Sequence, residues 1–373
     1  MQSLLGSFDW QSRWARGAVQ SGCYYTLGSA MENKIGYTYL KVADGQGMYQ
    51  WIDYNGNGVE ELEEFETALY RDQANYVRVY LTNQDQEKVY ATTWTQRLLL
   101  RPEAVWRNSG GIRRFLARFS NSTTLQSQLK KSTALVEQSD APMAVLLNPV
   151  CGDLSDSSLR SGSLQFRNLF SFHPSHPVYG AEALYQQQQN KYFTVNGFEY
   201  TSSESWQFSA RYRIWRNLQV RASFTRGGQS ASSSYLTTRN YSLIGERSRL
   251  GMQYAASSRW SMSLAYSYRW QRNESGVESL FANSVEGEAA CRMTGRGSLS
   301  VKCRFEHLQF HGDSHTTVAY TMMEALSDGP NGVLNCSYQV RLGEYLQLDC
   351  QYEGRLSTEG LRHTGTVTVK AVF

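Results

Sequence analysis

One short stretch of the sequence has the spacing of oxygen ligands that a calcium ion requires. Asp53, Asn55 and Asn57 alternate, Gly58 follows, and Glu64 completes the pattern D-x-[DN]-x-[DN]-G-x5-E. Calcium is held in such a loop by side-chain oxygens, one backbone carbonyl and a final bidentate carboxylate, and the glycine allows the sharp turn around the ion. We therefore predict a structural calcium site with these ligands: Asp53, Asn55, Asn57, the carbonyl of Val59, Glu61 through a water molecule, and Glu64.

The surroundings of this loop predict one helix rather than the usual two. The preceding segment 45–51 is too rich in glycine for a helix, whereas Leu62, Phe65 and Leu69 have the spacing of one buried helical stripe. The alternative interpretation is an Asn-Gly turn followed by an acidic first helical turn. At most three carboxylates would bind the ion, which favours a structural site over a calcium sensor.

No other motif points to chemistry. The sequence has no G-x-S-x-G elbow, phosphate-binding glycine loop or helix with paired metal ligands, and we expect no enzymatic activity. The net charge is +4, and arginines such as Arg211, Arg213, Arg221 and Arg269 are spread over polar strand faces. Because a nucleic-acid binder gathers its cations into a stripe, we expect no nucleic-acid partner.

Strict alternation of apolar and polar residues dominates the chain after residue 192. In the clearest segment, 260–270, Trp260, Leu264 and Trp270 belong to a wholly apolar set, and Ser263 and Arg269 belong to the other set. Successive side chains of a strand point to opposite faces, so one face is apolar and the other suits water. Aliphatic residues in the middle of the apolar face and aromatics near its ends are typical of a strand that crosses a bilayer.

Composition excludes the helical class of membrane protein. The longest apolar run is 143–147, against roughly 20 residues for a spanning helix, and the mean hydropathy is −0.50. The chain has 24 Tyr, 15 Phe and 9 Trp but only 6 Pro, which suits strands and tight turns. The predicted fold is all-β: an antiparallel transmembrane-type β-barrel, or its C-terminal part, preceded by a mixed β segment with one calcium loop and a short helix.

Three regions are expected along the chain. Residues 1–110 form a strand-rich segment with the calcium loop, 111–191 a poorly defined connecting region that includes a hairpin over 115–131 and a loop over 140–156, and 192–373 the barrel strands. We expect about eleven or twelve strands of ~9–13 residues. The longest connections, 227–236 and 271–281, do not all fall at one end of the strand array as we divide it.

The six cysteines form no C-x-x-C pair, so a zinc or redox motif is not indicated. A three-residue hairpin loop over 342–344 would set Cys336 opposite Cys350 on the apolar face. We predict that these two cysteines are neighbours and leave open whether they form a disulfide, which depends on the compartment.

The chain resembles the C-terminal portion of large, uncharacterised outer-membrane β-barrel proteins of Bacteroidetes. The resemblance rests on 47–58 running into Glu64-Phe65-Glu66, and on 352–355, 363–365 and 371–373 near the end. It implies an outer-membrane location, lipid as a partner, and recognition by barrel-assembly machinery through a C-terminal strand that ends in Phe373. No secretory leader is visible, so we expect a missing N-terminal part of a longer chain as a further partner.

Two functions are compatible with these patterns. The first is an outer-membrane barrel with a structural role, or a role in the transport or secretion of an unknown cargo. The alternative is a soluble extracellular all-β protein that recognises carbohydrate through its aromatic residues. The two differ in where the alternating aromatics lie: on a lipid-facing surface, or buried between two sheets.

Overall fold

The computed structural model describes residues 5–138, 158–293, 297–343, 345–358 and 360–371. Strands dominate it. The strands are β1 Leu5–Trp14, β2 Val19–Lys41, β3 Tyr49–Trp51, β4 Phe65–Thr67, β5 Tyr76–Leu100, β6 Phe119–Ser132, β7 Leu159–Phe172, β8 Tyr179–Thr194, β9 Gly197–Trp215, β10 Leu218–Ser233, β11 Tyr241–Ala255, β12 Trp260–Asn273, β13 Ser279–Met293, β14 Gly297–His311, β15 Gly329–Leu342, β16 Leu346–Ser357 and β17 Gly360–Ala371. The helices are α1 Glu103–Trp106, α2 Gly111–Leu116, α3 Thr133–Glu137 and α5 Thr317–Met323, with 3₁₀ turns η1 Ala15–Gly17, η2 Leu62–Glu64, η3 Arg71–Gln73 and η4 Thr237–Arg239.

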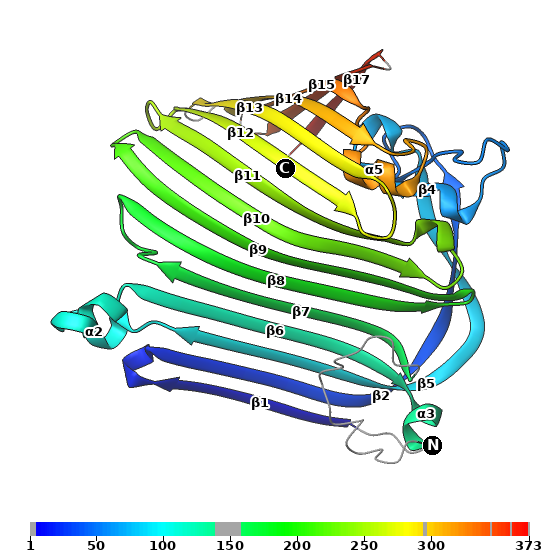
Figure 1. The fold of residues 1–373 in the computed structure, drawn as a ribbon, viewed down its shortest axis with the longest axis horizontal. Helices are drawn as coiled ribbons and strands as arrows, with labels where there is room; N and C mark the ends of the chain where they lie inside the picture. The colour runs from blue at the N-terminus through cyan, green and yellow to red at the C-terminus, as the bar shows by residue number, and fades with distance from the viewer. Residues whose placement is uncertain (1–4, 139–157, 294–296, 344, 359, 372–373) are drawn as a thin grey trace.

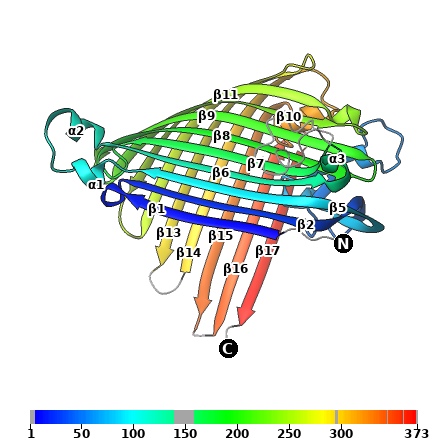
Figure 2. The same ribbon diagram turned by 90° about the horizontal axis from the view of Figure 1, so that it is seen from below.

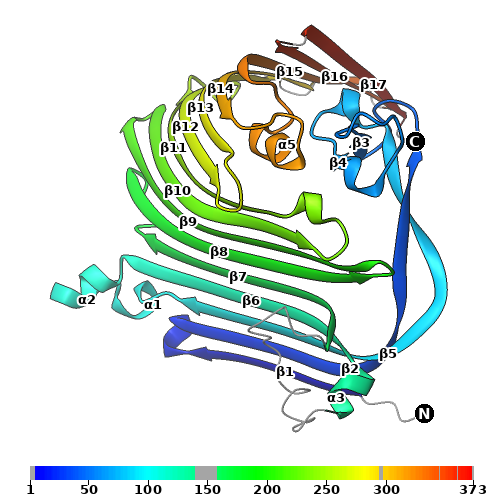
Figure 3. The same ribbon diagram turned by 45° about the vertical axis from the view of Figure 1, so that its right-hand side comes forward.

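All of these strands belong to one sheet. β1 pairs with β2, β2 with β5, and from β5 to β17 each strand pairs antiparallel with the next. The short strands β3 and β4 form a hairpin whose described ladder meets β5 at the Tyr49–Tyr76 pair. The sheet is strongly curved (Figure 2), and it curls around this hairpin and α5 (Figure 3). Within the described residues, β1 and β17 form its two edges, and no ladder joins them.

The three regions expected from the sequence contribute to this same sheet. β1, β2 and β5 come from residues 1–110, β6 to β8 from 111–191, and β9 to β17 from 192–373. Among the described residues after 192 there are nine strands of 12–19 residues. The expectation of eleven or twelve shorter strands was therefore wrong. These strands are longer than a transmembrane strand needs to be, because the hydrogen-bonded ladders between neighbouring strands continue beyond that length.

The connections differ between the two ends of the sheet (Figure 1). At one end, where β17 also ends, lie the two-residue turn 216–217 and the connections 15–18, 173–178 and 101–118, the last of which carries α1 and α2. At the other end lie the long connections 42–75 and 312–328, together with 234–240 and 274–278. The two longest connections predicted after residue 192 therefore lie at one end, because 241–255 is a single strand, β11. Bacterial barrels typically have short turns at one end and longer loops at the other, and the connection 101–118 departs from that pattern.

The alternation of the sequence matches the two faces of the sheet. On β12 the Leu264 side chain is 56% exposed on the convex outer face, whereas Arg269 is 5% exposed on the inner face. Val220 and Leu348 share the outer face and are half-buried among neighbouring side chains. Alternating aromatics such as Trp260, Tyr266 and Phe208 are exposed on this outer face and are not buried between two sheets. No described helix is long and apolar enough to span a membrane.

Apolar burial occurs on the inner side of the sheet, against α5. Thr316 caps this helix, because its hydroxyl accepts a hydrogen bond from the Ala319 N–H at 3.1 Å. Ala319 and Met322 of α5 pack with Leu280 of β13 and Leu308 of β14, and all four are at most 1% exposed. Burial of each large side chain contributes about 1.5–3 kcal/mol. This cluster fixes the loop 312–328 inside the curved sheet.

Several local predictions were wrong. The helix expected after the calcium-type loop is instead the 3₁₀ turn η2 followed by β4, and Leu69 is 54% exposed. The ladder to β3 overrides the helical spacing, because Phe65 and Trp51 pair across it. The hairpin expected over 115–131 is the end of α2 followed by the single strand β6. The loop expected over 140–156 lies outside the described residues, as do Cys151 and Phe373.

The cysteine register was also wrong, by two residues. Leu342 pairs with Leu346, so Cys336 lies opposite Tyr352 and Cys350 lies opposite Tyr338. Both cysteines are free thiols in the structure. The hairpin loop does have three residues, as predicted, but it comprises 343–345 rather than 342–344. The apolar pattern cannot distinguish these two registers, because a shift of two residues leaves every side chain on its own face.

Candidate functional site: a charged inner wall closed by two loops

Charged residues occupy neighbouring inward positions on four consecutive strands, β11 to β14. Arg247 lies opposite Arg269 across the β11–β12 ladder, and Glu286 lies opposite Arg304 across the β13–β14 ladder. Since cross-strand neighbours have Cβ atoms about 4.5–5.5 Å apart, these ladders bring the charges together on one wall. The alternation of each strand directs them inward, and the register between strands determines which of them meet.

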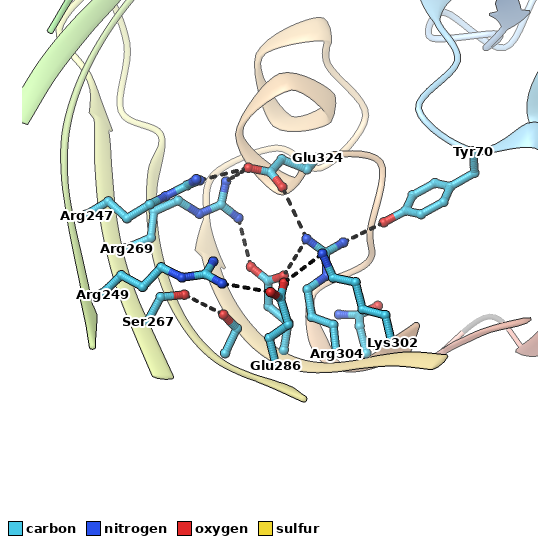
Figure 4. Close-up of polar contacts among 12 residues, drawn as sticks. Tyr70, Arg247, Arg249, Ser267, Arg269, Glu286, Lys302, Arg304 and Glu324 are labelled. Atoms are coloured by element: carbon cyan, nitrogen blue, oxygen red, sulfur yellow. Dashed lines mark hydrogen bonds and ion pairs between the residues drawn. The ribbon is translucent and has the colours of Figure 1, made fainter. Parts of the chain in front are cut away.

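Glu324 lies at the centre of this wall although it comes from the loop 312–328 (Figure 4). Its Oε1 atom lies 2.6 Å from Arg269 Nη1 and 3.0 Å from Arg247 Nη2, and its Oε2 atom lies 3.7 Å from Arg304 Nη1. Glu324 ends α5 with a positive φ of 53°. This left-handed residue turns the chain back from the helix and places the carboxylate among three guanidinium groups.

Glu306 and Glu286 complete the pairing. Glu306 Oε1 lies 3.1 Å from Arg269 Nη2, and Glu286 bridges Arg249 at 2.7 Å and Lys302 at 3.2 Å. We call the following eight residues the wall cluster: Arg247, Arg249, Arg269, Glu286, Lys302, Arg304, Glu306 and Glu324. It holds five cations and three carboxylates, so its formal charge is +2. Its surplus of positive charge favours anionic groups at the inner wall.

The wall cluster contains a buried ion pair, and each of its charges depends on its partner for compensation. The side chains of Arg269 and Glu306 are only 6% and 7% exposed. Removing one partner of a buried ion pair leaves an uncompensated charge, which is why such pairs are costly to break. For Glu324, burial opposes ionisation, but the guanidinium groups of Arg269, Arg247 and Arg304 outweigh it and lower the pKa of the carboxyl.

The loop 42–75 reaches the same wall from the opposite side. Arg304 Nη2 donates to the Tyr70 hydroxyl at 3.1 Å, and the guanidinium of Arg355 lies 4.2 Å from the centre of the Tyr70 ring. Arg355 also pairs with Asp72 at 2.8 Å. Tyr70 is part of the apolar cluster that contains Leu308. The loop is therefore fixed to β14 and β16 by one aromatic ring and one ion pair.

The two inward loops also contact each other. The Tyr320 hydroxyl of α5 donates to the Thr67 carbonyl at 2.7 Å. Glu66 of β4 pairs at 2.8 Å with Arg239, which belongs to the connection 234–240. Burial raises the pKa of the Glu66 carboxyl, although Arg239 acts in the opposite direction. We call residues 42–75 and 312–328 together the plug. Figure 3 shows both parts of the plug within the curve of the sheet.

A polar cavity of about 620 Å³ lies between the plug and the wall. Arg247, Arg269 and Glu324 of the wall cluster line it on one side, and Tyr37 and Glu199 line it on another. The Tyr37 hydroxyl donates to Glu199 at 2.6 Å. This lining of guanidinium, carboxylate and phenol groups can bind a hydrophilic solute by hydrogen bonds and charge.

The calcium-type loop lies within the plug, and the structure gathers most of its predicted ligands. Asp53 Oδ1 accepts from the Gly56 N–H at 2.7 Å, and the side-chain amide of Asn55 donates to Glu61 at 2.8 Å. Asn57 accepts from the Val59 N–H at 2.6 Å through its side-chain oxygen and also reaches Glu61. The loop therefore closes through its own hydrogen bonds, as the alternative Asn-Gly turn interpretation has it.

Glu64 reaches the Glu61 N–H at 3.4 Å through its carboxylate but also has partners outside the predicted ligand set. Its carboxylate accepts from the Trp51 indole N–H at 2.8 Å and from the Tyr54 N–H at 3.2 Å, and the residue is 1% exposed. Among the residues that the structure describes, no three His, Cys, Asp or Glu side chains form a group that could hold a metal ion. Asp53 and Glu61 fit calcium, whereas Glu64 would have to leave its indole partner. The calcium site stays a prediction.

Sequence reasoning placed Arg269 on the inner face but did not predict the wall cluster. One signal was available: Arg247, Arg249 and Arg304 occupy alternate positions on the polar faces of neighbouring strands. Glu324 and Tyr70 had no such signal, because they lie in connections whose paths the strand pattern does not determine.

No protein-family model and no curated protein matches the sequence. Solved structures are similar to it only distantly. The triple-mutant porin of Rhodopseudomonas blastica has 8% identity, covers 92% of this chain and 100% of its own, and gives a TM-score of 0.23. The TodX monoaromatic hydrocarbon channel has 8% identity, coverages of 94% and 90%, and a TM-score of 0.29. The ferric-catecholate import receptor Fiu of E. coli K12 has 11% identity, coverages of 100% and 77%, and a TM-score of 0.25. TM-scores of this size carry no argument about what the chain does.

Proposed function

We propose that this chain is an outer-membrane β-barrel protein with a transport-type role, and that the plug controls the passage of a hydrophilic solute through its lumen. The observation that carries the proposal is the division of one curved sheet into an exposed apolar outer face and an inner face with buried charges. Phe305 is 67% exposed on the outer side of β14, and its neighbour Glu306 is 7% exposed on the inner side. Exposed apolar surface of this extent is stable where hydrocarbon, rather than water, surrounds it.

The plug supports transport over a purely structural role. Residues 42–75 and 312–328 cross the interior and are fixed by ion pairs that solute or pH can rearrange, namely Glu324 with Arg269 and Glu66 with Arg239. The cavity between plug and wall provides a polar volume of about 620 Å³ at the point where a solute would enter. We propose lipid as the partner of the outer face. We also propose barrel-assembly machinery as a partner during biogenesis.

Extraction and quenching test the location. After a carbonate wash the protein should stay in the membrane fraction and enter solution only with detergent. Brominated phospholipid should quench Trp206 and Trp260, which lie on the outer face with 49% and 46% exposure. Release by carbonate, together with unquenched tryptophan, would overturn the proposal and favour the soluble carbohydrate-binding alternative.

Conductance tests the role. In a planar bilayer the intact protein should pass small, infrequent currents, because the plug fills the interior. A Glu324→Gln variant should open more often, since Arg269 and Arg247 lose the carboxylate that fastens the plug to the wall. Identical conductance of the two proteins would contradict the role of the plug in transport.

A further inference from the structure

A basic pocket lies at the end of the sheet that carries the turn 216–217, away from the plug. Its volume is about 670 Å³, and its lining comes from the segment with α1 and α2 and from the turn between β7 and β8. The charged groups that line it are Arg101, Arg107, Arg114 and Arg118 with one carboxylate, Glu103, so their sum is +3. Glu103 lies 4.0 Å from Arg107. Within the described part of the chain, Arg101, Arg114 and Arg118 have no carboxylate partner.

The pocket also has a polar atom without a partner. His173 follows β7 with a positive φ of 51°, and its Nε2 atom is buried without a hydrogen-bond partner among the described residues. Burial lowers the pKa of this imidazole, and the nearby Arg118 lowers it further. A neutral imidazole and three unpaired guanidinium groups can hold the oxygens of one anionic group.

An apolar groove of about 470 Å³ adjoins the pocket on the outer face of the sheet. Its floor consists of Ala181, Ala210 and Ala222, which lie directly opposite one another on β8, β9 and β10. Its walls are phenylalanine rings from β7, β9 and β10: Phe170, Phe172, Phe208 and Phe224. Phe208 and Phe224 border this alanine row on one side, and Phe172 continues the row on β7, so the small alanine side chains leave a hollow beside the rings.

Aromatic contacts connect the groove to the pocket. Phe119 lines the pocket, and its ring centre lies 5.0 Å from that of Phe172 in the groove. Phe115 of α2 packs on Phe119 at 5.3 Å, which holds α2 against the outer face. Ile112 and Leu116 of the same helix are 78% and 41% exposed. Basic residues beside exposed apolar residues on one short segment are typical of a segment that lies at a membrane interface.

We propose that the pocket and groove together bind one anionic phospholipid, with its phosphate among Arg101, Arg114 and Arg118 and an acyl chain along the alanine floor. Charge complementarity selects a net-negative headgroup, and the adjoining groove selects a lipid over a free anion. The inference rests on the proposed membrane location of the outer face. It goes beyond that function, because it assigns a specific ligand to the rim of the barrel.

Native mass spectrometry of the full chain in detergent tests the site. Micelles doped with phosphatidylglycerol should leave one lipid bound per chain, with at least about tenfold tighter binding than phosphatidylcholine. In the double variant Arg114→Ala/Arg118→Ala, the ratio of phosphatidylglycerol to phosphatidylcholine affinity should fall roughly tenfold or more. Ala210→Phe should fill the groove and abolish retention. The matched control Arg216→Ala, at the exposed β9–β10 turn of the same end, should behave as the native protein does.

The outcomes separate the possible ligands. Inorganic phosphate should neither raise the thermal unfolding midpoint nor displace the lipid, and full competition by phosphate would overturn the proposal in favour of a free-anion site. Equal lipid retention by all four proteins would overturn it in favour of an unspecific lipid belt. Each variant is also tested for retention in carbonate-washed membranes. A variant that stays there but loses phosphatidylglycerol supports the lipid site, whereas release of the native protein would overturn the membrane location itself.

Discussion

Arg269 Nη1 on the wall strand β12 lies 2.6 Å from Glu324 Oε1 on the loop 312–328, and this contact joins the sheet to the plug (Figure 4). The two residues are 55 positions apart in the sequence. Arg269 is almost fully buried, so it depends on Glu324 and Glu306 for compensation of its charge. The plug is therefore fixed by a contact that one substitution can remove.

Substitution of Glu324 should loosen the plug without unfolding the sheet. Glu324→Gln keeps the shape but leaves Arg269 with only Glu306 as a charged partner, which should cost about 1–3 kcal/mol. The measurement is thermal unfolding in detergent, read alongside bilayer conductance. Arg259→Gln, in the exposed turn between β11 and β12, is the control and should change neither. Unchanged stability of Glu324→Gln would contradict the role assigned to this contact.

Acid should loosen the plug through the same residue. The pKa of Glu324 is lowered in the folded state, so its stabilising effect is complete above the unfolded value of about 4.3 and is lost as pH falls through the lower folded value. The difference in unfolding midpoint between the native protein and Glu324→Gln should therefore be constant near neutral pH and shrink below about pH 4. Glu66, whose pKa is raised, is common to both proteins and cancels in the difference. A difference that grew on acidification would refute the assignment.

The faces of β12 can be tested with one charge placed on either side. Leu264→Arg places a cation on the outer face and should cost about 2–4 kcal/mol in a bilayer if the residue lies near the midplane. Ser263→Arg places the same side chain on the inner face opposite Glu288 and should be tolerated. Folded protein in isolated membranes, measured by heat-dependent gel mobility, distinguishes the two. Equal yields would argue that the outer face does not contact lipid.

Fluorescence of Trp51 can report calcium binding, because its indole contacts Glu64. An ion bound through Asp53 and Glu64 would remove the Glu64 carboxylate from the Trp51 indole, which it contacts at 2.8 Å. Calcium should then raise the unfolding midpoint and change tryptophan emission in the native protein but not in Glu64→Gln. Trp51→Phe should retain the stabilisation and lose the emission change. The same midpoint with and without calcium in the native protein would count against the site.

The hairpin register predicts which thiols can be joined. Cys350 lies opposite Tyr338 rather than Cys336. A Tyr338→Cys variant should therefore form a disulfide with Cys350 under mild oxidation, because directly opposed residues have Cα atoms about 4.5–5.5 Å apart. The native Cys336 and Cys350 should remain reactive to thiol reagents under denaturing conditions. Efficient linkage of the native pair would restore the register predicted from the sequence.

The sequence by itself determined which side chains share a face. Leu264 and Arg269 lie on opposite sides of β12 because side chains alternate along any strand, whatever its partner is. The apolar outer face follows from the same local rule. The pattern could not determine registers that differ by two residues, so Cys336 was assigned the wrong partner.

Only the tertiary structure decided what the inner face surrounds. Tyr70 and Arg304 are 234 residues apart, and Glu324 reaches Arg269 from a connection whose path no periodicity describes. The segment 62–69 has helical spacing, yet pairing with β3 makes residues 65–67 the strand β4. Alternation is a property of neighbouring residues, whereas plug, wall cluster and cavity depend on contacts between distant segments. For that reason the chemistry of the interior could not be predicted from the strand pattern that revealed the exterior.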